Sequence, residues 1–147
     1  MPKFDVTLLT SSKYLKAEAG DEFVEMILEE DRILTEALEK KGLTVTRTYW
    51  DDPNFNWAET KYVLFRTPWD YFNRYSEFAP WLEKVSQQTR LLNSAEVLRW
   101  NIDKHYLADV AECGVRIVPT QFLARTSAVN LRQLMEHNSW SQAIIKP

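Results

Sequence analysis

Hydrophobic and polar positions alternate with two different periods in the first part of the chain. Residues 4–10 form an apolar, partly β-branched run, which predicts a strand. Residues 21–41 follow with apolar side chains at helical spacing and charged residues between them. The apolar positions of this segment are Phe23, Ile27, Leu34 and Leu38. We predict an amphipathic helix here, with Asp21 as its N-cap and Gly42 just beyond its end.

The same alternation continues up to residue 93. Further strands are predicted at residues 44–49, 61–66 and 90–92, with a helix over residues 72–87. Strands that alternate with helices are typical of an open, mostly parallel sheet. We therefore predict that residues 1–93 form one α/β domain with a Rossmann-like sheet.

The pattern changes after residue 93. Predicted helices are residues 94–100, 104–113 and 129–137, and predicted extended segments are residues 115–124 and 142–145. Ser94 and Asp103 are expected to cap the first two of these helices. We interpret residues 94–147 as a second, partial α+β domain. Its last strand would need a cover, supplied by further sequence or by a second copy of the chain.

Composition excludes several classes of protein. The chain has 147 residues, of which 45% are hydrophobic and 27% charged, as in ordinary soluble domains. The net charge of −3 and the absence of a Lys/Arg run argue against a nucleic-acid partner. A single cysteine, Cys113, excludes an internal disulfide and is interpreted as a small buried residue. The single cysteine suggests a reducing compartment, so we expect a cytoplasmic location. No segment is long and apolar enough to predict a membrane span.

Candidate binding residues follow the predicted strands. Ligands of open α/β sheets lie beyond the carboxyl ends of the strands. Arg66 ends one predicted strand and could hold a substrate carboxylate with two hydrogen bonds, while Asp70 could orient an amine. The alternative is an internal ion pair between these two residues. Trp69 and Tyr71 either line the same cleft or pack against the core.

Other polar residues indicate structure more than chemistry. Residues 50–57 alternate aromatic with Asp and Asn side chains, which could form a cation site but favours a loop anchored by its rings. His105 and His137 have no neighbours at the spacing of metal ligands. The glutamates of the first helix are interpreted as its solvated face; they are Glu25, Glu29, Glu30, Glu36 and Glu39. We predict no catalytic residue and no metal ligand.

An ordered set of short motifs resembles a known family. The motifs are Trp50-Asp51-Asp52, Trp57, Arg66-x-x-Trp69-Asp70-Tyr71, Leu92-Asn93, Trp100-Asn101-x-Asp103-Lys104-x-Tyr106-Leu107, Gly114, Pro119-Thr120 and Lys146-Pro147. Their order is similar to the opening of RimK-like and glutathione-synthetase-like ATP-grasp ligases, especially the group of the cycloserine-forming ligase. The resemblance covers nearly the whole chain.

The resemblance implies an ATP-dependent and Mg²⁺-dependent ligase that joins a small-molecule carboxylate to an amine through an acyl phosphate. It implies a pre-ATP-grasp domain over residues 1–93 and the start of the ATP-grasp domain over residues 94–147. Lys104 and Lys146 match the two family lysines that contact ATP phosphates. Without the resemblance, both would be interpreted as solvated lysines at the ends of elements.

The family's remaining nucleotide-binding and magnesium-binding residues cannot be located in these 147 residues. We therefore expect the chain to be the N-terminal portion of such an enzyme and to be inactive alone. The alternative is a stand-alone module with ATP-grasp ancestry that binds a small ligand or a protein. A third interpretation is a short chain that dimerises to rebuild the missing part.

Overall fold

The computed structural model describes residues 2–124 and 127–146 and contains one four-stranded parallel sheet in the order β2-β1-β3-β4. The strands are β1 (Phe4–Thr10), β2 (Val45–Tyr49), β3 (Thr60–Thr67) and β4 (Arg90–Leu92). The helices are α1 (Glu22–Glu39), α2 (Tyr75–Ser86), α3 (Ala95–Ile102), α4 (Tyr106–Glu112) and α5 (Leu131–His137), with short 3-10 helices η1 (Ser12–Tyr14) and η2 (Trp57–Glu59). The predicted open, Rossmann-like α/β sheet is confirmed.

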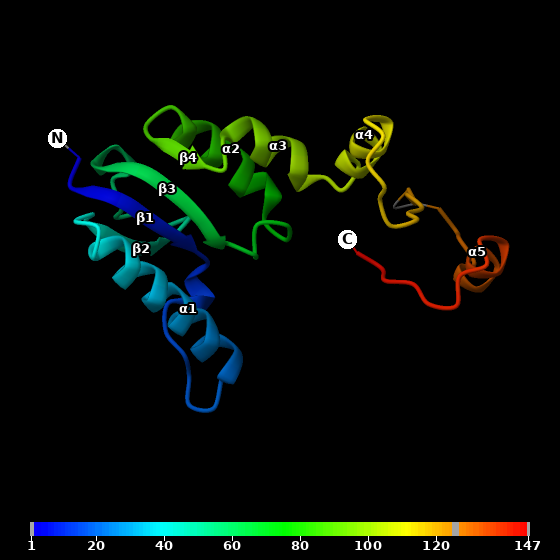
Figure 1. Cartoon of the computed structure of the whole chain (residues 1–147), viewed down its shortest axis with the longest axis horizontal. Coiled ribbons are helices and arrows are strands. Elements are labelled where there is room, and N and C mark those ends of the chain that lie inside the picture. The colour runs from blue at the N-terminus through cyan, green and yellow to red at the C-terminus, as the bar shows by residue number, and fades with distance from the viewer. Residues whose placement is uncertain (1, 125–126, 147) are drawn as a thin grey trace. The chain divides into compact units, whose positions relative to one another are not determined.

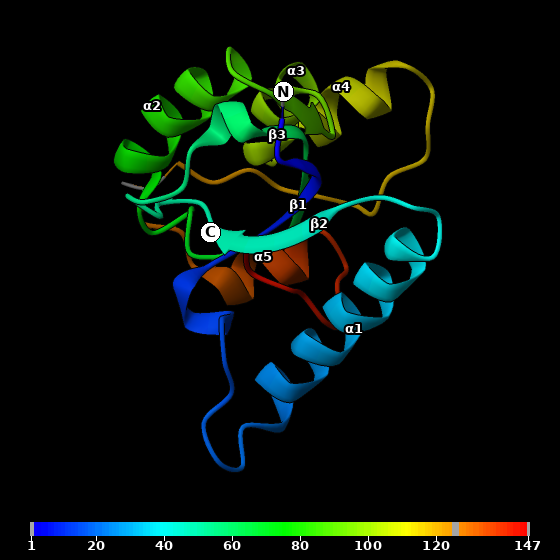
Figure 2. The same ribbon diagram turned by 90° about the vertical axis from the view of Figure 1, so that its left-hand side faces the viewer.

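Strand β1 lies inside the sheet, where Leu8 is paired with Arg47 of β2 and Leu64 of β3. Helix α1 covers one face of the sheet, and helices α2 and α3 cover the other (Figures 1 and 2). Leu8 and Leu9 are fully buried between these layers. Because successive residues of a strand point to opposite faces, β1 contributes to both layers of the core.

Helix α1 begins and ends close to the predicted positions. The Asp21 carboxylate accepts a hydrogen bond from the Val24 N–H at 3.0 Å, as an N-cap does. Gly42 has a φ of +80°, which glycine adopts without the steric cost of a side chain. The buried positions of the helix are Val24, Ile27 and Asp31. Phe23, which we expected on this buried face, is instead 51% exposed.

The other face of the sheet holds an aromatic core. Trp50 and Trp57 are 2% and 6% exposed, and both belong to one cluster with Phe78 of α2. The Asp52 carboxylate accepts a hydrogen bond from the Asn54 N–H at 2.9 Å. The loop over residues 50–57 is therefore anchored by its rings and closed by its polar side chains, as the favoured interpretation predicts. Helix α3 joins the same cluster through Leu98.

The chain divides into two compact units, Met1–Ile102 and Asp103–Pro147. In the second unit the helix predicted over residues 129–137 is present as α5, but no described residue forms a strand. The strands expected at residues 115–124 and 142–145 are thus wrong. Most of their apolar side chains are exposed; for example, Val118 and Ile144 are 80% and 86% exposed. An extended segment without a paired neighbour has no hydrogen-bond ladder to hold it.

No described residue from 103 to 146 is buried. Cys113 is exposed, which corrects the expectation of a buried thiol. The predicted domain boundary after residue 93 stays a prediction, because a division into compact units does not show where one domain ends and the next begins. None of the helices within the described ranges is both long and apolar enough to cross a membrane.

Candidate functional site

The carboxyl ends of β1 and β3 form the centre of the candidate site. After β1 the chain continues into α1 on one face of the sheet, and after β3 it continues into α2 on the other (Figure 1). This change of face marks the topological switch point, where open α/β sheets bind their ligands. The hydroxyl groups of Thr10 and Thr67 lie 2.6 Å apart there, and the Ser11 N–H donates to the Thr67 carbonyl at 3.1 Å. All three residues are buried.

Arg66, the penultimate residue of β3, points toward α1. Its Nε donates to Oδ1 of Asp31 at 2.9 Å, and its Nη2 donates to Oε2 of Glu30 at 3.1 Å. Asp31 is 2% exposed, whereas the side chains of Arg66 and Glu30 are 29% and 56% exposed. Arg66 is therefore held by one buried carboxylate and touches one exposed carboxylate.

A second arginine, Arg47 of β2, shares the same buried carboxylate. Its Nε donates to Oδ2 of Asp31 at 2.7 Å, and its Nη2 donates to the Tyr14 carbonyl at 2.7 Å. The same Nη2 lies 3.4 Å from the hydroxyl group of Thr10. Two guanidinium groups thus meet one carboxylate beside the carboxyl end of β1. This arrangement can bind an anion more readily than a cation.

Asp70 belongs to a separate network on the aromatic side. Its Oδ1 accepts a hydrogen bond from the Trp50 indole N–H at 3.0 Å, and Arg74 Nη1 lies 3.4 Å from its Oδ2. Arg74 also donates to Oδ2 of Asp51 at 2.6 Å and lies over the Trp50 ring at 4.6 Å. Hydrogen bonds to Glu77 and then to Asp51 raise the pKa of Arg74 above its ordinary value.

The described ion pairs of Arg66 and Asp70 do not join these two residues. The internal ion pair that we considered between them is therefore absent from the described part of the chain. Arg66 pairs with acidic residues of α1, whereas Asp70 pairs with Arg74, the residue before α2. A substrate-binding role for either one stays a prediction.

Trp69 and Tyr71 have different surroundings. Trp69 is 43% exposed and forms an aromatic group with Tyr14 and Phe23, at ring-centroid distances of 5.8 and 6.2 Å. Tyr71 packs on the core, with its ring 5.1 Å from that of Phe78. Trp69 therefore has surface available for a ligand, whereas most contacts of Tyr71 are those of a packing residue.

The two predicted ATP-contacting lysines lie in the second unit. Lys104 is half-buried, and its Nζ lies 5.7 Å from the centre of the Tyr106 ring. Lys146 is exposed and follows no strand, because residues 142–145 do not form one. The described residues thus lack the strand that was expected to frame a phosphate site at Lys146. Among those residues, no group of three or more His, Cys, Asp or Glu side chains could hold a metal ion.

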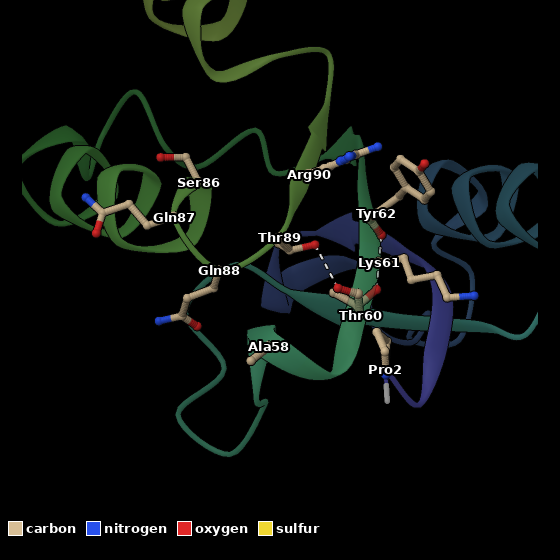
Figure 3. A pocket seen from close by; sticks show the side chains of 10 residues that line it. All are labelled: Pro2, Ala58, Thr60, Lys61, Tyr62, Ser86, Gln87, Gln88, Thr89 and Arg90. Carbon is tan, nitrogen blue, oxygen red and sulfur yellow. Dashed lines mark hydrogen bonds between the residues drawn. The ribbon is translucent and has the colours of Figure 1, made fainter.

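Two hollows lie elsewhere on the first unit. The larger, of about 500 Å³, lies at the opposite end of the sheet, around the start of β3 and the turn between α2 and β4 (Figure 3). Lys61 and Arg90 line it together with amide and hydroxyl side chains, and the Thr89 hydroxyl donates to the Thr60 carbonyl at 2.8 Å. The smaller, of about 350 Å³, is lined by η1 and the following loop. Neither hollow contains a predicted site residue.

Comparison with known proteins identifies the family of this chain. Residues 6–93 match the family model described as the N-terminal domain of D-cycloserine synthetase DcsG. The chain belongs to this family. The cycloserine biosynthesis protein DcsG of Streptomyces lavendulae is 40% identical over 91 residues, which are 62% of this chain and 30% of that protein.

A solved structure is similar as well. The crystal structure of D-cycloserine synthetase DcsG matches with a TM-score of 0.73 and 31% sequence identity, and the match covers 91% of this chain and 42% of that one. The chain therefore spans less than half the length of these two DcsG proteins. The family match over residues 6–93 covers the candidate site and the sheet except Phe4 and Asp5 at the start of β1.

Sequence reasoning missed Asp31 and Arg47, although a pattern for Asp31 was present. Asp31 follows Val24 by seven residues and Ile27 by four, which places it on the buried face of the helix. A carboxylate at such a position requires a partner with a positive charge. Arg47 stands inside a short strand of mixed polarity, and nothing in its local sequence marks it.

Proposed function

We propose that this chain supplies the N-terminal portion of an ATP-dependent ligase that joins a small carboxylate to an amine. The observation that carries the proposal is the match of residues 6–93 to the N-terminal domain of a synthetase family. In this proposal, residues 1–93 contact the substrate and residues 94–147 begin the ATP-grasp domain. The remainder of the site, including the Mg²⁺ ligands, lies outside these 147 residues.

The geometry supports a role in binding the carboxylate. A carboxylate is a poor electrophile because its leaving group would be an oxide. ATP, when bound, would supply the phosphoryl group that turns one carboxylate oxygen into a leaving group, and the amine would then expel phosphate. Such reactions depend mainly on positioning and on charge neutralisation. Arg66 has the charge and planar shape that suit the carboxylate, and Trp69 lies exposed in the loop that follows β3.

In this proposal, Asp70 and Tyr71 shape the aromatic side of the candidate site. The Asp70 carboxyl group lies just beyond the carboxyl end of β3, where it would orient the incoming amine directly or through water. Lys104 and Lys146 would act as point charges for the phosphates of ATP. The described residues 142–145, which precede Lys146, do not form the strand that was expected there.

The test begins with the mass of the native protein and a hydroxamate assay for the acyl phosphate. The native protein and the 147-residue chain are each incubated with Mg²⁺, ATP, a panel of small carboxylates and hydroxylamine. Hydroxylamine converts an acyl phosphate into a hydroxamate, which is detected as its coloured iron(III) complex. We expect hydroxamate from a native protein more than twice as long as this chain, and none from the chain alone. Lys104→Ala should reduce ATP binding in the native protein, whereas Lys84→Ala on α2 should not.

One observation favours the second candidate, a stand-alone binding module. The aromatic group of Tyr14, Phe23 and Trp69 is partly exposed and complete within the first unit. A ligand that contacts these rings would need no further domain. A native mass equal to that of this chain, with no thermal shift from ATP and Mg²⁺, would exclude the ligase and leave the module.

A further inference from the structure

The side chain of Asp31 connects helix α1 to strands β2 and β3 of the sheet. It is 2% exposed on α1, and its two oxygens accept hydrogen bonds from Arg47 of β2 and Arg66 of β3, at 2.7 and 2.9 Å. Both arginines use Nε for this contact. Because a guanidinium group is planar, one fixed Nε contact strongly restricts the directions of its remaining N–H groups.

Each arginine keeps donors that the protein does not use. Nη2 of Arg47 reaches the Tyr14 carbonyl, and Nη2 of Arg66 reaches Glu30. Within the described ranges, no hydrogen-bond partner is present for Nη1 of either arginine. Their side chains are 18% and 29% exposed, so these donors have access to solvent.

The charges of this group do not cancel without Glu30. Two guanidinium groups and the buried Asp31 carboxylate together carry one positive charge. Glu30 supplies the balancing negative charge through one contact of 3.1 Å, and its side chain is 56% exposed. Exposed ion pairs of this kind are weak and exchange readily with other anions.

We propose that Asp31 positions Arg47 and Arg66 as a paired binding site for the carboxylate of the substrate, and that Glu30 is the counter-ion which this carboxylate replaces. The proposal rests on the proposed function for its substrate class. It adds Arg47 as a binding residue and Asp31 as a positioning residue. It places the carboxylate on the α1 side of the switch point, away from the network of Asp70 and Arg74.

The first experiment measures anion binding on the full 147-residue chain. The arginine Nε–H resonances of Arg47 and Arg66 are followed by NMR in a ¹⁵N-labelled sample during titration with sodium acetate, and separately with sodium chloride and with sodium phosphate at equal ionic strength. Saturable shifts of both resonances with acetate alone are expected. Equal shifts with chloride, or no saturation, would overturn the proposal. Tighter binding of phosphate than of acetate would overturn the choice of a carboxylate.

A surface variant separates this proposal from a purely structural ion pair. Glu30→Gln removes the competing counter-ion without touching Asp31, so acetate should bind about 2- to 5-fold more tightly. Glu39→Gln is the matched control, because it makes the same charge change on an exposed residue at the C-terminal end of α1, away from Arg47 and Arg66. Equal acetate affinity in the two variants would contradict the role of Glu30.

The positioning role is tested with Asp31→Asn. This variant should lose the acetate response of Arg66 while the backbone amide spectrum stays that of a folded chain. In the native-length protein we expect it to raise KM for the carboxylate at least 10-fold with a smaller change in kcat. An unchanged KM in a folded variant would overturn the role of Asp31. Acetate binding without any ATP-dependent ligase activity would instead refute the proposed function and leave this site standing.

Discussion

Asp31 and Trp50 are the two side chains that link the packing of the core most directly to the polar groups of the candidate site. Asp31 lies on the α1 side of the sheet and Trp50 on the α2 side, and both are 2% exposed. The polar group of each side chain forms a hydrogen bond with a residue that is distant in the sequence. A buried polar pair of this kind contributes little to the free energy of unfolding while it is intact. When one member is removed, the other stays buried without a partner, and this lowers stability.

Replacement of Asp31 should therefore lower stability. Asp31→Ala leaves Arg47 and Arg66 without their common acceptor, and we expect a loss of about 3 kcal/mol in the free energy of unfolding, at the low end for a broken buried ion pair. The low end applies because both arginines can reach water. Chemical denaturation monitored by circular dichroism measures this loss. Glu30→Gln should change stability by less than about 0.5 kcal/mol, and a similar loss in both variants would contradict the argument.

Trp50 offers a test on the opposite face. Trp50→Phe removes the N–H that donates to Asp70 at 3.0 Å and leaves a buried acceptor without its donor. We expect a loss of about 1–3 kcal/mol, to which any remaining cavity adds. The control is Trp100→Phe at a position that is 45% exposed, where denaturation should show little change. Equal effects at both positions would mean that the indole hydrogen bond contributes nothing.

Among the helices, α2 differs from α1 in how its first turn is stabilised. No side-chain hydrogen bond caps α2 at Arg74, whereas Asp21 caps α1. Glu77 in the first turn of α2 instead accepts two hydrogen bonds from Arg74, at 2.6 and 3.1 Å. A negative charge near a helix N-terminus is favourable, so this pair replaces part of what a cap would supply.

The Arg74–Glu77 pair should make stability depend on acid pH. Its hydrogen bonds lower the pKa of Glu77, so the folded state holds the charged form more strongly than the unfolded state does. The stabilisation is present above the ordinary pKa of glutamate, roughly 4.3, and is lost as pH falls below it. Glu77→Gln should therefore flatten the decline of stability between neutral and acid pH. Urea denaturation over that pH range measures the slope, with Glu18→Gln as control; parallel slopes in the variant and the parent chain would refute the effect.

Sequence patterns predict these elements well where each one is amphipathic and has a neighbour to pack on. Strand β1 and helix α1 are clear in the sequence because their apolar spacing matches one buried face each. Residues 115–124 contain enough Val and Phe to suggest a strand, but composition cannot supply the neighbouring strand that pairs with it. Arg66, the penultimate residue of β3, is identifiable because it ends a predicted strand. The Asp31 contact is not, because it joins residues 16 and 35 positions apart.

Across the whole chain, the two compact units differ in how much they bury. All residues of the hydrophobic core lie between Val6 and Leu98. The unit Asp103–Pro147 has no buried residue among those described. Elements with few buried contacts open with a low free energy, so the stability of this chain is expected to be uneven.

Hydrogen exchange should reveal this difference. Amides of β1 and β3 should exchange slowly, because they open only with the whole first unit, whereas those of α4 and α5 should exchange at least 100-fold faster. Mass spectrometry of peptides from the intact chain gives both rates in one sample. Similar protection of α5 and β1 would show that the second unit is stabilised independently, and would contradict this prediction.

The crowding of Trp50, Trp57 and Trp81 has an optical consequence. The Trp81 ring lies 5.8 Å from that of Trp50 and 5.3 Å from that of Trp57, measured between ring centres. Electronic transitions of indoles this close and at fixed angles couple, which produces an intense near-ultraviolet circular dichroism band. All three indoles adjoin the core under α2, so this band would report on that face alone. Ligand binding beside α1 could then be followed through Trp69, whose emission would change while the coupled band stays constant.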